Sequence, residues 1–130
     1  MAALRIIGDD LVPEELSSLI GASPTRAERK GDAIPIRTGE RIAKTGGWRL
    51  EATATEPENL DAQVPEILGV LTSNLDVWRA LRARYRLDLF CGWFMNESNE
   101  GVSVSPATLL ALGERGIELG LDIYAPSADT

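Results

Sequence analysis

Residues 87–95 limit the possible folds more than any other part of this chain. Apolar side chains occupy both of the alternating faces that a β-strand here would present. One face carries Leu87, Leu89, Cys91, Trp93 and Met95, and the other carries Asp88, Phe90, Gly92 and Phe94. A strand with two largely apolar faces is shielded from water on both sides. We therefore expect this segment to be a central strand of a sheet.

Three further segments, residues 2–8, 48–55 and 117–124, have the composition or the alternation of strands. In the last of them we expect Ile117, Leu119, Leu121 and Ile123 to point inward, and Glu118, Gly120, Asp122 and Tyr124 to point outward. Glycine and proline interrupt residues 22–47, which predicts a long loop with a short strand near residues 25–30 and an extended piece near residues 34–37. A returning strand is expected at residues 102–104.

Four segments place apolar residues at helical spacing. Pro13 and Pro106 are positioned to begin two of these helices, because a proline leaves no N–H unpaired at a helix start. The other two helices are expected at residues 60–71, with Asp61 as the cap, and after residue 74. The pattern predicts an α+β fold, with an antiparallel or mixed sheet and helices packed mainly on one face in a two-layer sandwich.

The composition fits one domain spanning residues 1–130, with residues 125–130 as a frayed tail. The sequence contains no histidine and a single cysteine, Cys91. These counts exclude Ser-His and Cys-His catalysis, histidine metal ligands and an internal disulfide, and we expect no metal and no cofactor. The N-terminal residues do not resemble a secretory signal, and no segment is apolar enough to cross a membrane. We therefore expect a cytoplasmic protein that does not bind membranes.

Charge is unevenly distributed along the chain. The formal net charge is −7, which disfavours nucleic acid as a partner of the molecule as a whole. Residues 88–130 contain seven acidic residues and one basic residue, whereas residues 26–49 contain seven basic residues and three acidic ones. Two regions of opposite charge allow binding of a polar partner or of a second copy, or they face each other within the fold.

Charged side chains at the predicted strand positions are the first candidates for a binding site. Glu118 and Asp122 share a face of one predicted strand with Tyr124, and neighbouring strands could bring Arg49 beside them. Paired carboxylates can perform acid–base catalysis. They can also form cross-strand ion pairs on a solvated sheet face, which is the interpretation we favour.

Two pairs of neighbouring charges are further candidates. Asp9 and Asp10 follow a predicted strand, where acids bind metals or organise a turn. Arg79 and Arg82 are three positions apart, so they are neighbours on a helix and could bind a phosphate or carboxylate, or pair with nearby acids on a solvated face. The three tryptophans are expected in the core rather than on a stacking platform: Trp48, Trp78 and Trp93.

Several short motifs carry a family resemblance. They are LRIIGDD at residues 4–10, VPEEL at residues 12–16, GWRL at residues 47–50, VSP at residues 104–106 and LDIY at residues 121–124. On these motifs the chain resembles, over nearly its whole length, the uncharacterised bacterial family named domain of unknown function 4279. The family has no established activity, so the resemblance implies no catalytic residues. By analogy with other small bacterial proteins, it suggests an immunity or accessory role in conflict systems.

The function hypotheses follow from these surfaces. We expect a non-enzymatic binding or accessory domain that uses a sheet face or residues 26–48 to bind a protein partner. In the immunity-like version, the acidic C-terminal third steers a basic toxin. The alternative is a small enzyme or small-ligand binder that uses carboxylates and arginines in place of histidine. A homo-oligomeric structural module is a third hypothesis, and it requires an exposed apolar patch.

Overall fold

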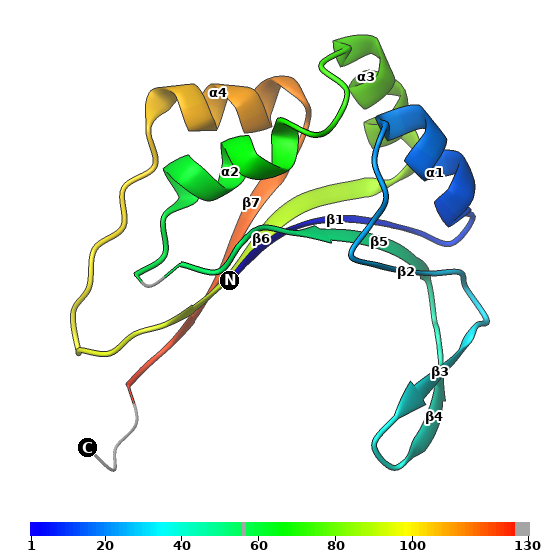
Figure 1. The fold of residues 1–130 in the computed structure, drawn as a ribbon, viewed down its shortest axis with the longest axis horizontal. Coiled ribbons are helices and arrows are strands. Elements are labelled where there is room, and N and C mark those ends of the chain that lie inside the picture. Colours follow the sequence, from blue (N-terminus) through cyan, green and yellow to red (C-terminus); the bar gives the residue numbers. More distant parts are fainter. Residues whose placement is uncertain (56, 127–130) are drawn as a thin grey trace.

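A five-stranded mixed sheet is the base of the molecule in this computed structural model, which describes residues 1–55 and 57–126 (Figure 1). In order across the sheet, the strands are β2 (Arg26–Glu28), β5 (Gly46–Glu51), β1 (Ala2–Gly8), β6 (Arg86–Phe94) and β7 (Glu118–Tyr124). Neighbouring strands are antiparallel except β6 and β7, which are parallel. The prediction of an antiparallel or mixed sheet is confirmed, and the sheet is mixed.

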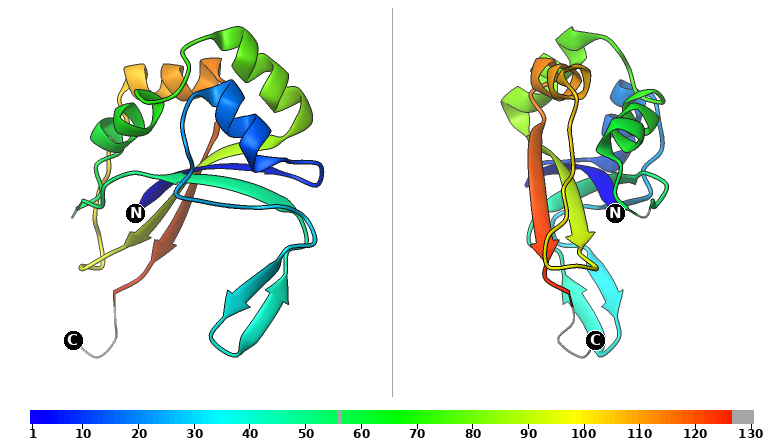
Figure 2. Two further views of the ribbon diagram at one scale, coloured as in Figure 1. Left: turned by 45° about the vertical axis from the view of Figure 1, so that its right-hand side comes forward. Right: turned by 90° about the vertical axis from the view of Figure 1, so that its left-hand side faces the viewer.

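The described helices lie on one face of this sheet (Figures 1 and 2). They are α1 (Pro13–Ile20), α2 (Leu60–Leu68), α3 (Leu75–Arg84) and α4 (Pro106–Glu114). Pro13 and Pro106 begin α1 and α4 as predicted. Gly21 follows α1 with a φ of 86°, a left-handed conformation that glycine adopts at little cost. The predicted α+β fold with helices on one face is confirmed.

The core lies between the helices and the sheet, and it contains all three tryptophans. Trp48 is 1% exposed, and its indole Nε1–H donates a hydrogen bond to Ser17 Oγ on α1 at 3.1 Å. Trp78 is fully buried and donates to the carbonyl oxygen of Thr72 at 2.8 Å. Trp93 is 7% exposed. These positions confirm the prediction that the tryptophans pack in the core.

Strand β6 is an interior strand between β1 and β7, although β1 occupies the middle position. Its helix-facing side is buried, with Leu89 completely inaccessible and Cys91 1% exposed. Its other side is not shielded by a second layer, and the side chain of Phe94 is 71% exposed. On this side Asp88 and Gly92 are nevertheless buried and Phe90 is half-buried, so the prediction of a strand shielded on both faces is correct except at its last residue, Phe94.

The connection from β6 to β7 differs from the prediction. Residues 102–104 form no strand, and the chain passes through α4 before it returns as β7. A strand that returned after a short turn would be antiparallel, whereas a parallel neighbour needs a crossover segment of this kind. Strand β5 also ends early, at Glu51, because the backbone N–H of Thr53 donates to Glu66 Oε2 on α2 at 2.6 Å.

Asp61 does not cap α2, as was predicted, and its carboxylate contacts α4 instead. The side chain of Asn59 caps α2 by accepting a hydrogen bond from the backbone N–H of Ala62. Asp61 Oδ1 instead accepts from the backbone N–H of Ser105 at 2.9 Å and from Thr108 Oγ1 at 2.7 Å, at the start of α4. These bonds hold the pKa of Asp61 below its usual range, with the backbone N–H of Ser105 as the largest cause. Asp61 thus joins α2 to α4.

Residues 22–47, predicted as a long loop, contain β2 and a separate hairpin. The hairpin consists of β3 (Ala33–Ile36) and β4 (Gly39–Ile42), and we call it the arm. The arm projects from the sheet on the side opposite the helices (Figure 2). At its base, the backbone N–H of Gly31 donates to Ala43 O and the N–H of Ala43 donates to Asp32 O, each at 2.9 Å.

Strand β7 is an edge strand, and part of its apolar face is open to water. Leu121 and Ile123 were predicted to point inward, but they are 43% and 49% exposed because the C-terminal half of β7 extends beyond the helices (Figure 2). Residues 125–126 form no regular structure, and the remainder of the predicted tail, residues 127–130, lies outside the described residues. Within the described chain, every helix is too short or too polar to cross a membrane.

Candidate functional site

The side of the sheet that no described helix covers, which we call the open face, carries a row of five charged residues. Cross-strand register places one residue from each strand directly beside the next: Arg26, Arg49, Arg5, Asp88 and Glu118. Residues directly opposite each other in a sheet point to the same side. The row is therefore basic over β2, β5 and β1, and acidic over β6 and β7.

Arg5 and Asp88 form the ion pair at the middle of this row. Arg5 Nε lies 2.8 Å from Asp88 Oδ1, and Arg5 Nη2 lies 2.6 Å from Asp88 Oδ2, so the ion pair is bidentate. The Arg5 guanidinium also lies over the Phe90 ring, 4.5 Å from its centroid. The hydrogen bond to Asp88 is the main reason that the pKa of Arg5 is raised. This pair covers the apolar residues beneath it, and Asp88 is only 3% exposed.

The two outer arginines of the row are less neutralised. Arg49 Nε donates to Glu51 Oε1 on the same strand at 3.0 Å. Arg26 is exposed, and no hydrogen bond or ion pair joins its side chain to another described residue. Like charges directly opposite each other destabilise a sheet. The stacking of Arg26, Arg49 and Arg5 therefore concentrates positive charge that an anionic ligand would relieve.

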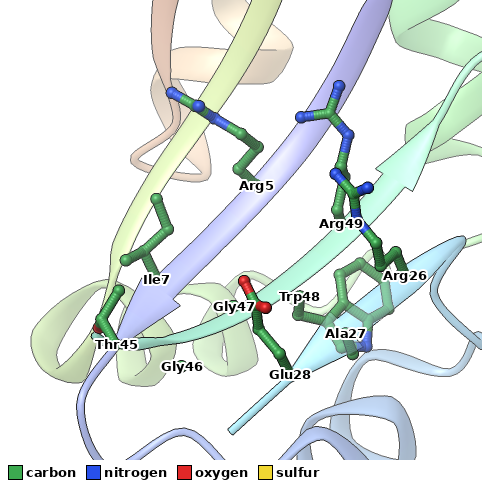
Figure 3. A pocket seen from close by; sticks show the side chains of 10 residues that line it. All are labelled: Arg5, Ile7, Arg26, Ala27, Glu28, Thr45, Gly46, Gly47, Trp48 and Arg49. Atoms are coloured by element: carbon green, nitrogen blue, oxygen red, sulfur yellow. The ribbon is translucent and has the colours of Figure 1, made fainter. Parts of the chain in front are cut away.

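A pocket of about 210 Å³ lies at this basic end, beside the arginine side chains (Figure 3). The Glu28 carboxylate lies next to Gly47 on the neighbouring strand, where a Cβ on Gly47 would be in ordinary contact with Glu28 Oε1 at 3.8 Å. Arg41, from the arm, donates to Glu28 Oε2 at 3.2 Å. The pocket is lined by three arginines and one acid, so it can hold a carboxylate or a phosphate group.

The opposite end of the open face is acidic and aromatic. Asp122 Oδ2 accepts a hydrogen bond from the Tyr124 hydroxyl at 2.7 Å, and this bond is the main reason that the pKa of Tyr124 is raised. The Tyr124 ring stacks on Phe94, with centroids 4.6 Å apart and planes within 8°. Gly120, between Glu118 and Asp122, borders open space.

The structure thus brings four of the predicted site residues onto one face: Arg49, Glu118, Asp122 and Tyr124. It does not bring Asp9 and Asp10 together with them. These two lie in the turn after β1, where Asp9 Oδ2 is 3.3 Å from Lys30 Nζ and Asp10 Oδ2 is 3.3 Å from Arg84 Nη2. A side-chain hydrogen bond from Thr45, with Lys30 as a further cause, lowers the pKa of Asp9.

Arg79 and Arg82 lie on α3, in the helix layer, and take no part in the open face. Arg79 Nη1 pairs with Asp76 Oδ1 at 3.0 Å, as on an ordinary solvated helix. The Arg82 side chain packs against Gly116, where an added Cβ would lie 3.1 Å from Arg82 Nη1. The sequence did not identify Arg5, Arg26 or Phe94, although Arg5 is the one charged residue among the apolar residues of β1.

No group of three or more potential metal-ligating side chains occurs among the residues that the structure describes. The profile of one protein family, described as domain of unknown function (DUF4279), matches residues 1–126 of the chain. The chain is a member of the DUF4279 family. Comparisons with curated proteins and with solved structures give no significant match. The description of the family specifies no activity, so the roles of the DUF4279 residues must be argued from their geometry.

Proposed function

We propose that this DUF4279 domain is a non-enzymatic binding domain whose open face takes a protein partner. The observation that carries the proposal is a row of three arginines, Arg26, Arg49 and Arg5, which are in register on neighbouring strands and line one pocket in a protein of net charge −7. An acidic side chain of the partner would enter this pocket, because guanidinium groups bind carboxylates with two parallel hydrogen bonds. The partner is therefore a protein with an exposed acidic segment.

The carboxylates of the open face support binding rather than catalysis. Asp88 is held by Arg5, Glu51 by Arg49, and Glu28 by Arg41 of the arm. A carboxylate whose oxygens already accept hydrogen bonds from an arginine has fewer free acceptor sites for a substrate. These pairs instead fix the arginines in place, so that less side-chain entropy is lost when an anion binds.

The arm supplies a second contact for a partner on the same side. Its strands are exposed, and residues 32–44 contain three basic residues, Arg37, Arg41 and Lys44, against two acidic ones, Asp32 and Glu40. A two-stranded hairpin has little stability by itself in water, so contact with a partner would hold the arm in place. A basic arm beside a basic pocket favours an acidic partner through the same electrostatic attraction.

A small-ligand binder is the second candidate, and the size of the pocket favours it. A volume of about 210 Å³ suits a single carboxylate or phosphate compound rather than a folded segment. In the immunity-like version of the proposal, the acidic end of the open face would meet a basic toxin instead. In each version the domain works in a bacterial cytoplasm, where a reducing environment suits a buried, unpaired Cys91.

The proposal is tested by capture of partners from a lysate of the native host at low and high salt. We expect one protein with an acidic segment to be retained at low salt and released at high salt, because exposed charges are screened. The double variant Arg26→Ala/Arg49→Ala should lose this protein. The control Arg79→Ala removes an exposed arginine from α3, in the helix layer, and should retain it.

Retention of the same protein by Arg26→Ala/Arg49→Ala would contradict the proposal. A partner that is lost on Glu118→Ala but not on the arginine variant would indicate the acidic end and the immunity-like version. If the wild-type chain retains no protein but binds phosphate or a dicarboxylate in calorimetry, and the arginine variant does not, the small-ligand candidate replaces the protein partner.

A further inference from the structure

The two edges of the sheet differ in how they are protected against pairing with another strand. At one edge, β2 has three residues, two of them charged, and follows Pro24. Short, charged strands are a common protection of sheet edges. At the other edge, β7 has seven residues without proline, and no described residue pairs with its outer side. Figure 2 shows β7 as the outermost strand.

The helix-facing side of β7 presents apolar side chains at this unprotected edge. Leu121 is 43% exposed and Ile123 is 49% exposed. Helix α4, which lies beside the start of β7 (Figures 1 and 2), also has two exposed leucines, Leu109 at 51% and Leu110 at 65%. An apolar strand edge with an apolar helix beside it is a surface that proteins normally cover.

The sequence of β7 is complementary to itself in one antiparallel register. A two-fold axis through Leu121 keeps the helices of both copies on the same side of the sheet. It places Leu119 opposite Ile123 of the second copy, and Leu121 opposite its own equivalent. On the open face it places Gly120 opposite Asp122 and Glu118 opposite Tyr124, so no acid faces another acid.

The neighbouring registers that keep the helices on one side are unfavourable. An axis through Gly120 would place Glu118 opposite Asp122 of the second copy, and an axis through Asp122 would place two aspartates opposite each other. Directly opposed like charges destabilise strand pairing. Among the registers centred on Gly120, Leu121 and Asp122, the two acids of β7 therefore favour the one through Leu121, in which three apolar cross-strand pairs form.

We infer that β7 is a dimerisation edge, and that a second copy of this chain pairs with it antiparallel about Leu121. The two sheets become one ten-stranded sheet, with the helices of both copies on the same side. The acidic ends of the two open faces meet at the centre, and the two arginine pockets lie at the outer ends. The dimer is independent of the proposed partner, because Arg26 and Arg49 are on the far side of the sheet from β7.

The oligomeric state is measured by sedimentation velocity over a range of protein concentrations. We expect a species of twice the 14.1 kDa chain mass. Leu121→Lys should give a monomer, because it places two ammonium groups opposite each other at the axis. Ile42→Lys is the control, because it changes an apolar residue of 60% exposure on the arm and should leave the dimer intact. Circular dichroism checks that both variants fold.

A cysteine pair tests the register in a Cys91→Ala background. Leu121→Cys should form a disulfide between chains on mild oxidation, since opposite Cα atoms of antiparallel strands lie about 4.5–5.5 Å apart. Ile123→Cys should not, because its equivalent in the second copy is four residues along the strand, about 14 Å away. A monomer at every concentration, a dimer that survives Leu121→Lys, or equal cross-linking by both cysteine variants would overturn the inference.

Discussion

The two faces of one sheet are built for different purposes. On the helix-covered face, Leu4, Ile6 and Leu89 are completely inaccessible to water. On the open face, the same strands carry Arg5 and Asp88, and the polar atoms of this pair lie within hydrogen-bond distance of each other. Alternation along each strand therefore separates residues that hold the fold together from residues that a partner can reach.

This separation implies that charges of the open face can change without loss of the fold. Burial of a large apolar side chain contributes several kcal/mol, whereas an exposed ion pair contributes about 0–1 kcal/mol. A face that contributes little to stability still holds three arginines in one row, against the repulsion between them. Such an arrangement is expected where binding, rather than stability, requires the charges.

The largest expected difference in stability between the two faces is between two adjacent residues of β5. Trp48→Ala should lower the free energy of unfolding by about 3–5 kcal/mol, because it opens a cavity between the sheet and α1. Arg49→Ala, one residue along on the open face, should lower it by less than about 1 kcal/mol. Urea denaturation of both variants measures the difference. Equal losses of unfolding free energy would mean that the open face contributes as much to stability as the helix-covered face.

The Arg5–Asp88 pair gives an intermediate effect, because Asp88 is a buried charge on the open face. Asp88→Ala should lower the free energy of unfolding by about 2 kcal/mol, since it leaves the guanidinium of a partly exposed Arg5 without its partner. The double variant Arg5→Met/Asp88→Leu should recover most of this loss, because removal of both charges leaves no unpaired group. A double variant less stable than Asp88→Ala would show that the pair stabilises the sheet by itself.

The fold was predictable where the apolar pattern is strong. The alternation or periodicity of β1, β6, α1 and α2 is visible in the sequence, and their bounds differ little from the prediction. Strand β4 was missed because its sequence, GERI, is mostly polar and pairs only with β3. The parallel direction of β7 was also missed, since it depends on the path of α4 over the sheet and not on the residues of β7.

The sequence predicted on which side of its strand each candidate residue lies, but not which residues of different strands are neighbours. Alternation placed Arg49, Glu118 and Asp122 on the outer side of their strands, and the structure agrees. The sequence could not show that Arg26, Arg49 and Arg5 are neighbours, because only the register of three separate strands makes them so. A single arginine within an apolar strand was nevertheless a signal, since such a residue requires a partner such as Asp88.

A smaller effect is expected for a carboxylate of the helix layer, where the charge has a structural role. Asp61→Ala should lower stability at neutral pH, because Ser105 and Thr108 lose their acceptor. The pKa of Asp61 is lowered in the folded state, so its contribution is complete above its ordinary pKa and is lost as the pH falls through the lowered value. Unfolding midpoints of the wild type and the variant should therefore converge in acid.

The control for this prediction is Asp76→Ala. Asp76 is also an acid in the first turn of a helix, but it pairs with Arg79 on the same helix rather than joining two helices. Its removal should cost less at neutral pH than the removal of Asp61. If the Asp61→Ala variant keeps the same difference from the wild type at all pH values, the charge of Asp61 does not hold α4 in place.

The smallest effect is a change in titration alone, at the exposed end of the open face. The Tyr124 hydroxyl donates to Asp122, so ionisation of the tyrosine breaks this bond and places two anions together, which raises the pKa of Tyr124. Asp122→Ala should lower that pKa toward the ordinary value of about 10. Asp122→Asn should lower it less, because an amide oxygen still accepts the bond.

Glu118→Ala, on the same face of β7, should leave the pKa of Tyr124 unchanged. NMR titration of ring-labelled tyrosine measures each value, and stability should barely change. If Asp122→Ala leaves the pKa of Tyr124 unchanged, the hydrogen bond between Tyr124 and Asp122 is not formed in solution. The Tyr124 side chain could then change its position when a partner binds.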